Sequence, residues 1–420
     1  MSTNLPTYSE RNEPYWRRNL AVAVFGSFTT LFSLSMLLPF LPLFVEQLGV
    51  RDAGAVVQWS SYAYSATFVG TAIMSPIWGR VADAYGRKAM LVRAAIGMAI
   101  LMSLIGTAHS TTELVVLRLL AGLIGGYGAA AIVMVGSQAP REKAGWALGV
   151  LSTGALSGNL LGPLVGGFLP DWVGIRGSFF IGGALIASAA LATIFLVRED
   201  FTRPEKQQHA VEPRSWNSTE VKAVVALLLA AGMVLLASMS IEPIITVYIH
   251  ELGVDQNHLA RYSGVIMSAT AFASMVAAPR IGALADRIGG WRVILVSLVA
   301  TGIVLVPQAW VTNWWQLGML RFLMGLTIAG LLPAIGQLIR GLASERNSGS
   351  LLGTLQSAQF VGQVLGPLIG GHVGAHFGMG PVFYVTTLLL FLSAGLVWIF
   401  RPRRVREPLR PLVAPQVVTR

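Results

Sequence analysis

The sequence predicts an all-α integral membrane protein with twelve transmembrane helices, arranged as two parallel six-helix repeats. Three observations predict this fold class. The chain of 420 residues is 54% hydrophobic and only 12% charged, whereas globular domains average about 25% charged residues. Apolar runs of about 20 residues, the length that crosses a bilayer as a helix, recur along the whole chain. Landmarks of the first half return in the second half in the same order.

The apolar runs place the helices and divide the chain into two halves. Polar residues at 1–18 predict an N-terminal tail, and a basic segment at 401–420 predicts a C-terminal tail. A polar linker at 198–221 separates a first half at 19–197 from a second half at 222–400. The predicted spans are 19–45, 59–79, 89–108, 113–137, 144–167, 178–197, 222–249, 260–281, 293–310, 316–339, 349–372 and 381–400.

The net charge of +11 is explained by membrane topology. If the N-terminus is cytoplasmic, Arg51, Arg176 and Arg261 lie outside, and Arg118 and Arg321 lie within spans. Every other Lys and Arg then lies in a tail, in a cytoplasmic loop or at its edge. Cytoplasmic loops of membrane proteins are enriched in these residues. We therefore expect both termini in the cytoplasm and no binding to nucleic acid.

The second half is a duplicate of the first. The matching landmarks are Pro39 and Pro243, Asp83 and Asp286, Arg118 and Arg321, and two decapeptides that begin at Gly158 and Gly362. The offset between partners is 203 or 204 positions in every case. Six spans return the chain to its starting side, so the repeats are parallel. In transporters built from parallel repeats, the substrate site lies near the middle of the membrane between the halves.

Both decapeptides have the pattern Gly-x-x-x-Gly-Pro-x-x-Gly-Gly. This composition would destabilise an exposed helix by several kcal/mol, at about 1 kcal/mol per Gly and 3 per interior Pro. In a bilayer, bare glycine backbones let helices approach closely, and proline allows a bend. We therefore predict a helix-packing seam between the halves. Its residues are Gly158, Gly162, Pro163, Gly166 and Gly167, with Gly362, Gly366, Pro367, Gly370 and Gly371 in the second copy.

The short loop between the second and third predicted spans carries one acid among several basic residues. A tight turn with topology-setting charges would explain its glycines and basic residues, but not Asp83. An anion is favoured at the N-terminus of a neighbouring helix. We therefore predict a conformational latch that breaks and reforms as the halves move. The latch residues are Gly79, Asp83, Gly86, Arg87 and Lys88, with Asp286 as the counterpart in the repeat.

Two ionisable residues within spans are the candidates for proton coupling. A buried arginine such as Arg118 costs at least about 2.5–3.5 kcal/mol to insert, although this side chain could instead extend to the outer interface. Glu242 is the only carboxylate deep within a span, and it directly precedes Pro243. Burial favours the neutral form of a carboxylic acid, so Glu242 could exchange a proton with water. The alternative is a carboxylate that faces a water-filled vestibule without a coupling role. Arg321 is placed like Arg118, and its role stays open.

Polar, aromatic and Met side chains on several spans are candidates for a substrate cavity. The three glutamines of the eleventh span share one helix face because of their spacing, and they could line the cavity or hydrogen-bond to another helix. Met and aromatic side chains form a soft surface that suits varied ligands. The candidate cavity residues are Phe32, Met36, Tyr127, Asn159, Met239, Gln356, Gln359 and Gln363.

Several classes of function are disfavoured by residue types. The chain has no Cys, and its six His residues are scattered. It has no phosphate-binding Gly-x-x-x-x-Gly-Lys-Ser/Thr motif. We therefore expect no metal site, no cofactor, no enzyme activity and no ATP-driven step.

At these motifs the chain resembles the major facilitator superfamily over nearly its whole length. Gly79–Lys88 resembles the signature loop motif of the superfamily, and Arg118–Gly122 resembles its fourth-helix motif. Gly158–Gly167 is similar to the fifth-helix motif of proton-driven antiporters, and Pro39–Pro42 fits the first-helix pattern of twelve-span drug:proton antiporters. The loop motif is specific for the superfamily, whereas the fifth-helix motif is less specific for efflux.

The resemblance implies a secondary transporter of a bacterial inner membrane, with the major facilitator fold. We expect proton-coupled efflux of hydrophobic drug-like compounds by alternating access, with Arg118 in proton transfer or substrate binding. The expected partners are hydrophobic small molecules, protons and membrane lipid, and we expect a monomer. Two alternatives stay open: a proton-linked carrier of a single metabolite such as a sugar or organic acid, and a non-transporting membrane receptor on the same fold.

Overall fold

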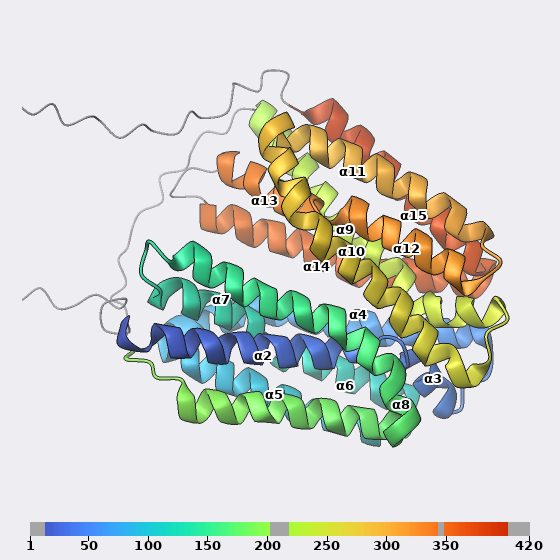
Figure 1. Cartoon of the computed structure of the whole chain (residues 1–420), viewed down its shortest axis with the longest axis horizontal. Helices are drawn as coiled ribbons and strands as arrows, with labels where there is room; N and C mark the ends of the chain where they lie inside the picture. Colours follow the sequence, from blue (N-terminus) through green and yellow to red (C-terminus); the bar gives the residue numbers. More distant parts are fainter. Residues whose placement is uncertain (1–12, 202–217, 343–347, 402–420) are drawn as a thin grey trace, which may run out of the picture.

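The computed structural model describes residues 13–201, 218–342 and 348–401. Within these residues the chain forms helices joined by short turns and contains no strand. The helices up to residue 201 form one bundle and those from residue 218 form a second, and the two bundles lie side by side (Figure 1). Residues 1–12 and 402–420 of the predicted tails and residues 202–217 of the predicted linker lie outside the described residues.

Every predicted span overlaps one or more helices, although several spans are divided, merged or lengthened. The helices are η1 (Glu13–Tyr15), α2 (Trp16–Met36), α3 (Leu41–Gln47), α4 (Ala53–Tyr85), α5 (Arg87–Thr107), α6 (Thr111–Ile124), α7 (Tyr127–Gln138), α8 (Ala144–Leu196), α9 (Ser218–Glu251), η2 (Gln256–His258), α10 (Leu259–Ile288), α11 (Gly290–Leu305), η3 (Val306–Trp310), α12 (Trp314–Ile328), α13 (Leu331–Leu342), α14 (Ser348–Phe377) and α15 (Met379–Phe400). We call the end of the bundles at which α2 begins and α15 ends the termini end.

The described helices are consistent with the twelve predicted spans. Nine of their segments are long and apolar enough to cross a membrane. One of the nine is the 53-residue α8, which Gly174 divides in two because its φ of 74° and ψ of 165° are not helical. Two further long helices, α4 and α14, are not among the nine. They pack against each other across the two bundles, so a wholly apolar surface is not required of them.

Two predicted spans of the first half are broken rather than continuous. The span at 19–45 ends its first helix at Met36 and resumes at Leu41, and Pro39 lies in the break. Proline has no N–H to continue the helical hydrogen bonds. The span at 113–137 is broken at Gly126, whose φ of 107° is accessible to glycine at little cost.

The first decapeptide packs α8 mainly against a helix of its own half, which corrects the prediction of a seam between the halves. A methyl group at Gly158 would lie 2.6 Å from the carbonyl oxygen of Phe28 on α2. Gly162 and Gly166 meet the backbone of α2 one and two turns further along. Because four residues make about one helical turn, these three glycines share one face, and that face is turned toward α2.

The second decapeptide repeats this arrangement in the second half. Gly362, Gly366 and Gly370 meet the backbone of α9, and a methyl group at Gly366 would lie 2.7 Å from the carbonyl oxygen of Leu236. As in the first copy, the proline of the pattern, Pro367, lies inside its helix. The duplicated pattern therefore builds the same helix pair twice, α2 with α8 and α9 with α14.

Only the last glycine of each decapeptide contacts the other half. A methyl group at Gly167 would lie 2.7 Å from the carbonyl oxygen of Ala260 on α10, and Gly371 packs against Ser61 on α4. The adjacent position in the pattern is rotated by about 100° around the helix, which turns this glycine away from the other three. Each decapeptide thus joins two helices within its half through three of its glycines, and it contacts the opposite half through its last glycine and through the backbone carbonyl of Leu160 or Val364.

Polar contacts join the halves from the middle of the bundles to the end opposite the termini. They are the ion pair of Arg261 with Asp171 and the hydrogen bonds of Gln256 with Glu46, Thr246 with the carbonyl of Pro39, Ser65 with that of Val364, and Ser268 with that of Leu160. At the termini end, methyl groups added to Gly79, Gly149 or Gly282 would meet no atom within 4 Å. The described conformation is therefore closed at the end opposite the termini.

We predict that Gly166→Ala destabilises the protein by about 1–3 kcal/mol, the usual cost of overpacking. The added methyl group would overlap the backbone of Met36. Gly149→Ala, on the same helix but with no neighbour within 4 Å, is the matched control. Thermal unfolding of both purified variants in detergent tests this. Equal melting temperatures for the two variants would contradict the proposed packing.

Candidate functional site

The candidate site begins at an acid within α9. Glu242 lies directly before Pro243, which is inside the helix. Because proline lacks an N–H, the carbonyl group of Met239 loses its normal helical partner. The helix is thereby loosened at the position that carries the acid, and the side chain of Glu242 is 13% exposed.

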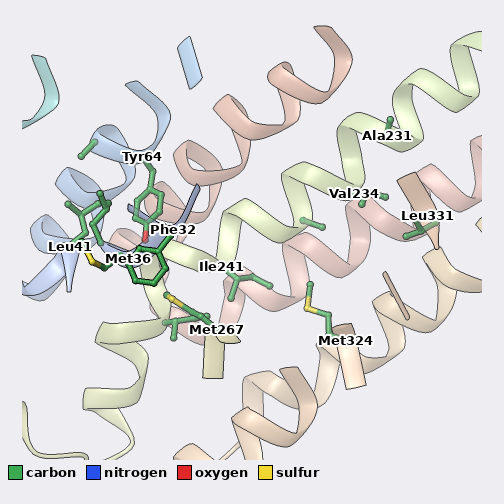
Figure 2. Packing of buried hydrophobic residues seen from close by; sticks show 14 of the residues in the cluster. Phe32, Met36, Leu41, Tyr64, Ala231, Val234, Ile241, Met267, Met324 and Leu331 are labelled. Atoms are coloured by element: carbon green, nitrogen blue, oxygen red, sulfur yellow. The ribbon is translucent and has the colours of Figure 1, made fainter. Parts of the chain in front are cut away.

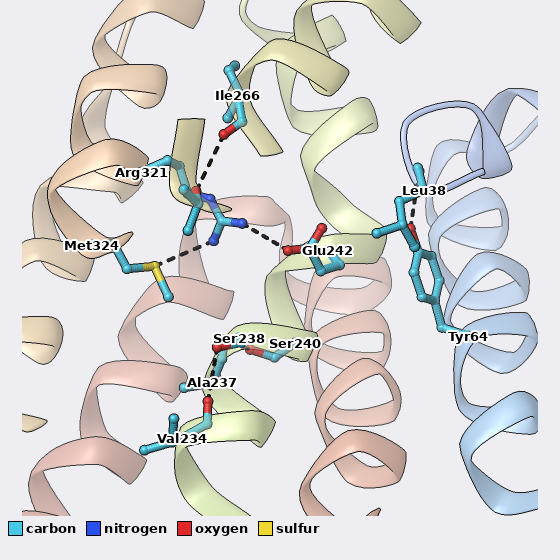
Figure 3. Close-up of polar contacts among 11 residues, drawn as sticks. Leu38, Tyr64, Val234, Ala237, Ser238, Ser240, Glu242, Ile266, Arg321 and Met324 are labelled. Atoms are coloured by element: carbon cyan, nitrogen blue, oxygen red, sulfur yellow. Dashed lines mark hydrogen bonds and ion pairs between the residues drawn. The ribbon is translucent and has the colours of Figure 1, made fainter. Parts of the chain in front are cut away.

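Glu242 forms an ion pair with Arg321 of α12 (Figure 3). The arginine Nη2 lies 3.0 Å from the glutamate Oε1, and the arginine side chain is only 1% exposed. The Nη1 of Arg321 also approaches the sulfur of Met324 at 3.5 Å. A charge removed from water to this degree needs a partner, so each residue explains the burial of the other.

The ion pair leaves one atom on each side without a hydrogen-bond partner. The buried atoms are Oε2 of Glu242 and Nε of Arg321, judged against the described residues. Most buried polar atoms in proteins are hydrogen-bonded, and exceptions often mark a functional group. Oε2 is a free acceptor for a proton or for a donor on a ligand. The pair can therefore change its bonding without first breaking a second hydrogen bond.

Arg118 is buried inside the first half rather than extended to the outer interface. It is 3% exposed, and its Nε donates to the carbonyl oxygen of Ala63 at 3.1 Å. Its guanidinium carbon lies 6.0 Å from the ring centroid of Tyr64. The structure does not place it against Glu242, so the predicted coupling pair is not a contact pair.

Tyr64 lies between the two candidate coupling residues. Its hydroxyl donates to the carbonyl oxygen of Leu38 at 3.1 Å, and its side chain is 1% exposed. Glu242 and Arg118 both act electrostatically on this phenol. Leu38 is the repeat counterpart of Glu242, at an offset of 204. The first half therefore has an apolar residue at the position where the second half carries its acid.

Sequence reasoning missed the partner of Arg321 and the position of Tyr64. The ion pair joins the seventh and tenth predicted spans, which are 79 positions apart. One available signal was that Glu242 is the only acid deep in any span, so a buried cation of the same half had one candidate partner. No comparable signal in the sequence identified Tyr64.

Two candidate cavity residues are packing residues instead. Tyr127 is 1% exposed, and its hydroxyl hydrogen-bonds Thr193 Oγ1 at 3.1 Å inside the first bundle. Met36 is fully buried, and its methyl group packs against Gly182. The prediction that these two residues line a substrate cavity is wrong, because their helix faces point into their own half.

Phe32 lies at the boundary between the halves. Its ring contacts that of Phe28, with centroids 5.6 Å apart. Figure 2 shows it beside Tyr64 of its own half and close to Met267 of the other. Met239 is half-buried, and its Cβ packs against Gly366. These side chains are apolar, and Met239 lies about one helical turn before Glu242 on α9.

The glutamine stripe of α14 faces away from the lipid side of its helix. Val361 and Leu365 are large apolar residues that are 55% and 42% exposed, as expected for contact with lipid. Gln359 lies about 200° from Val361 around the helix, and Gln356 and Gln363 share its face. Gln356 is exposed and the other two are half-buried. Asn159 on α8 is also exposed.

The latch loop makes a different contact from the predicted one. Asp83 pairs with Arg87 of its own loop at 3.4 Å, and the Asp83 side chain is 69% exposed. Glu199, at the end of the first half, accepts the backbone N–H groups of Arg87 and Lys88 at 3.0 and 2.7 Å. An acid does bind a helix N-terminus, as the dipole favours, but that acid is Glu199.

The structure also shows where the two glycines of the latch loop and its counterpart Asp286 lie. Gly86 ends α4 and precedes α5 with a φ of 89°, a conformation that favours glycine. Gly79 has open space around it, and Asp286 in the repeat is exposed. In this conformation the loop contacts its own half.

The sequence pattern of the family described as the Major Facilitator Superfamily matches residues 23–292 and 227–419. The chain belongs to the major facilitator superfamily. Multidrug resistance protein MdtG of Proteus mirabilis (strain HI4320) is 41% identical over 385 residues, which cover 91% of this chain and 96% of that protein. MdtG of Citrobacter koseri is 41% identical over 396 residues, covering 94% and 97%.

Solved structures share this major facilitator fold. A bacterial homolog of the human lysosomal transporter Spinster, in an inward-facing and occupied conformation, has a TM-score of 0.74 at 15% identity, covering 92% of this chain and 97% of that one. The human organic anion transporter MFSD10 has a TM-score of 0.70 at 18% identity, covering 91% and 99%. At these identities the likeness concerns the fold alone.

We predict that Arg321→Gln lowers stability by about 3 kcal/mol or more, because it leaves the carboxylate of Glu242 buried without a counter-charge. The double variant Glu242→Gln with Arg321→Gln should regain much of this loss, since two amides can hydrogen-bond without a net charge. The melting temperatures of the parent, the two single variants and the double variant form a double-mutant cycle. Purely additive losses would contradict a direct pair.

Proposed function

We propose that this protein exports varied hydrophobic compounds across a bacterial inner membrane in exchange for protons, by alternating access and with both termini in the cytoplasm. The observation that carries the proposal is the buried Glu242–Arg321 pair with its free carboxylate oxygen, next to the boundary between two parallel repeats. The relatives named multidrug resistance proteins support the choice of substrates.

The ion pair supplies the coupling step. A proton that reaches Glu242 Oε2 forms an O–H bond there and removes the carboxylate charge, which weakens the attraction to Arg321. The helices α9 and α12, which carry the two groups, are then free to change their relative position. Release of the proton on the cytoplasmic side restores the pair. Each proton that enters with the membrane potential supplies about 2.3 kcal/mol per 100 mV.

The described conformation fits one step of this cycle. It is closed at the end opposite the termini, which in the proposed orientation faces away from the cytoplasm. Glu242 is paired with Arg321 at 3.0 Å, as expected after the proton has left and before substrate binds. Arg118 is a second buried positive charge in the first half, and its guanidinium carbon lies 6.0 Å from the ring centroid of Tyr64.

Substrate variety follows from the type of surface around the site. Phe32 and Met267 lie close together at the boundary between the halves in Figure 2, and their side chains can repack around ligands of different shape. The glutamines of α14 can donate and accept hydrogen bonds without selecting a charge. Uptake of several unrelated dyes into inverted vesicles supports this function, whereas uptake of a single metabolite would indicate the narrower carrier.

We predict that Glu242→Gln abolishes dye uptake driven by a pH gradient in inverted vesicles, because an amide cannot bind and release a proton at this position. Exchange of labelled for unlabelled dye without a gradient should persist, since it needs no proton. Glu142→Gln, at an exposed loop position, is the control and should transport normally. Undiminished gradient-driven uptake by Glu242→Gln would remove this residue as the coupling group.

The ion pair of Arg261 with Asp171 should hold the non-cytoplasmic side closed. Asp171→Asn is predicted to shift the population toward the form that is open on that side. The chain has no Cys, so a single introduced Cys on α10 can report accessibility to a membrane-impermeant thiol reagent. The charge swap Asp171→Arg with Arg261→Asp should restore the slow labelling of the parent. Equal labelling rates in all three proteins would contradict the gate.

A further inference from the structure

A cavity of about 250 Å³ lies in the first half, away from the ion pair and toward the termini end. Its walls come from α4, α5 and the break between α6 and α7, and most of them are apolar. Trp78 and Arg93 form its aromatic and charged part, and Arg87 of the latch loop adds a second guanidinium. Phe360 of α14 lines the same cavity, so the cavity is bounded by residues of both halves.

Trp78 and Arg93 donate hydrogen bonds to backbone carbonyl groups at the break between α6 and α7. Trp78 Nε1 donates to the carbonyl oxygen of Leu123 at 2.7 Å, and Arg93 Nη2 donates to that of Gly125 at 3.1 Å. The guanidinium of Arg93 also lies over the indole ring, 3.5 Å from its centroid. This stack fixes the plane of the guanidinium against the cavity wall.

Arg93 retains hydrogen-bonding capacity after these contacts. Its Nε and Nη1 are buried and have no partner among the described residues. An unpaired guanidinium edge beside an apolar cavity is suited to a carboxylate or phosphate oxygen. The two acids near this end of the cavity are engaged elsewhere: Asp83 pairs with Arg87, and Glu199 accepts the backbone N–H groups of Arg87 and Lys88.

The duplicated half shows that the fold does not require this arrangement. The repeat counterparts of Trp78 and Arg93, at an offset of 203, are Ile281 and Val296. The second half has the corresponding break between α12 and α13, and there Ile281 packs directly against Gly330. An apolar side chain therefore suffices to fill the same place, so the aromatic and charged pair in the first half needs another explanation.

We propose that this cavity binds the acidic headgroup of an amphiphile, with a phosphate or carboxylate on Arg93 and the apolar part between Trp78 and Phe360. In the proposed orientation the cavity lies on the cytoplasmic side, where basic pockets between helices bind anionic lipid headgroups. Because Phe360 belongs to the second half, the ligand contacts both halves. Binding therefore stabilises the conformation described here relative to one in which the halves meet at this end.

The test measures ligand binding to the full-length protein in detergent by native mass spectrometry and by the shift in melting temperature. The probes are dioctanoyl phosphatidylglycerol, dioctanoyl phosphatidylcholine, dodecanoate and inorganic phosphate. Phosphatidylglycerol should bind and raise the melting temperature, and Arg93→Gln should weaken its affinity about tenfold, as expected for the loss of one hydrogen bond to a charged group. Phe360→Ala, which removes no hydrogen bond, should also weaken it.

Arg292→Gln is the matched control, because it removes one positive charge at an exposed position of α11 outside the cavity. Equal losses in Arg292→Gln and Arg93→Gln would overturn the site in favour of general surface charge, and full stabilisation by inorganic phosphate alone would overturn the role of the apolar part. Stronger binding of dodecanoate than of phosphatidylglycerol supports the site and identifies a soluble carboxylate as the ligand. Dye transport by Arg93→Gln in pure phosphatidylcholine vesicles tests the proposed export separately.

Discussion

The ion pair between Glu242 and Arg321 is the interaction on which the proposed function depends. Two opposite charges buried within a membrane-spanning bundle are stable only while they face each other. That requirement fixes the relative position of α9 and α12, and it sets the free energy needed to separate them. A proton on the carboxylate removes one of the charges and changes that cost. The chemistry of one side chain can therefore change the relative stability of two arrangements of helices.

The glycine decapeptides provide the rigid surroundings that such a pair needs. They hold α8 against α2 and α14 against α9 through backbone contacts that leave no room for a methyl group. Each half can then move as a unit, because three of the four glycines in each pattern pack within their own half. Rigid halves convert a local change at Glu242 into a movement of whole bundles, because close-packed helices shift together rather than deform.

The composition and the repeat were sufficient to predict the fold, because they depend on features that are local in the chain. Helix length follows from hydropathy, and the parallel halves follow from the repeat offset. The partners of side chains were harder to predict, since they depend on which helix faces meet. The glycine pattern indicated close packing but not that three of its four glycines face their own half. Tyr127 had suitable chemistry for a cavity, yet its hydroxyl points to Thr193.

The duplication also separates what the fold requires from what the function requires. Where the two halves carry equivalent residues, as with the glycine decapeptides, a shared structural role is a sufficient explanation. Where they differ, as with Leu38 and Glu242, the difference must come from what the protein does. The central acid is present in one half only, so the proposed coupling step is asymmetric although the scaffold is symmetric.

The most direct measurement of the central claim is proton release by the purified protein in a weakly buffered detergent solution on addition of a hydrophobic dye that it transports. The account predicts release from the parent as dye binds, with a midpoint pH that changes in Tyr64→Phe, and no release from Glu242→Gln despite normal dye binding. Release of the same size from Glu242→Gln would contradict the account.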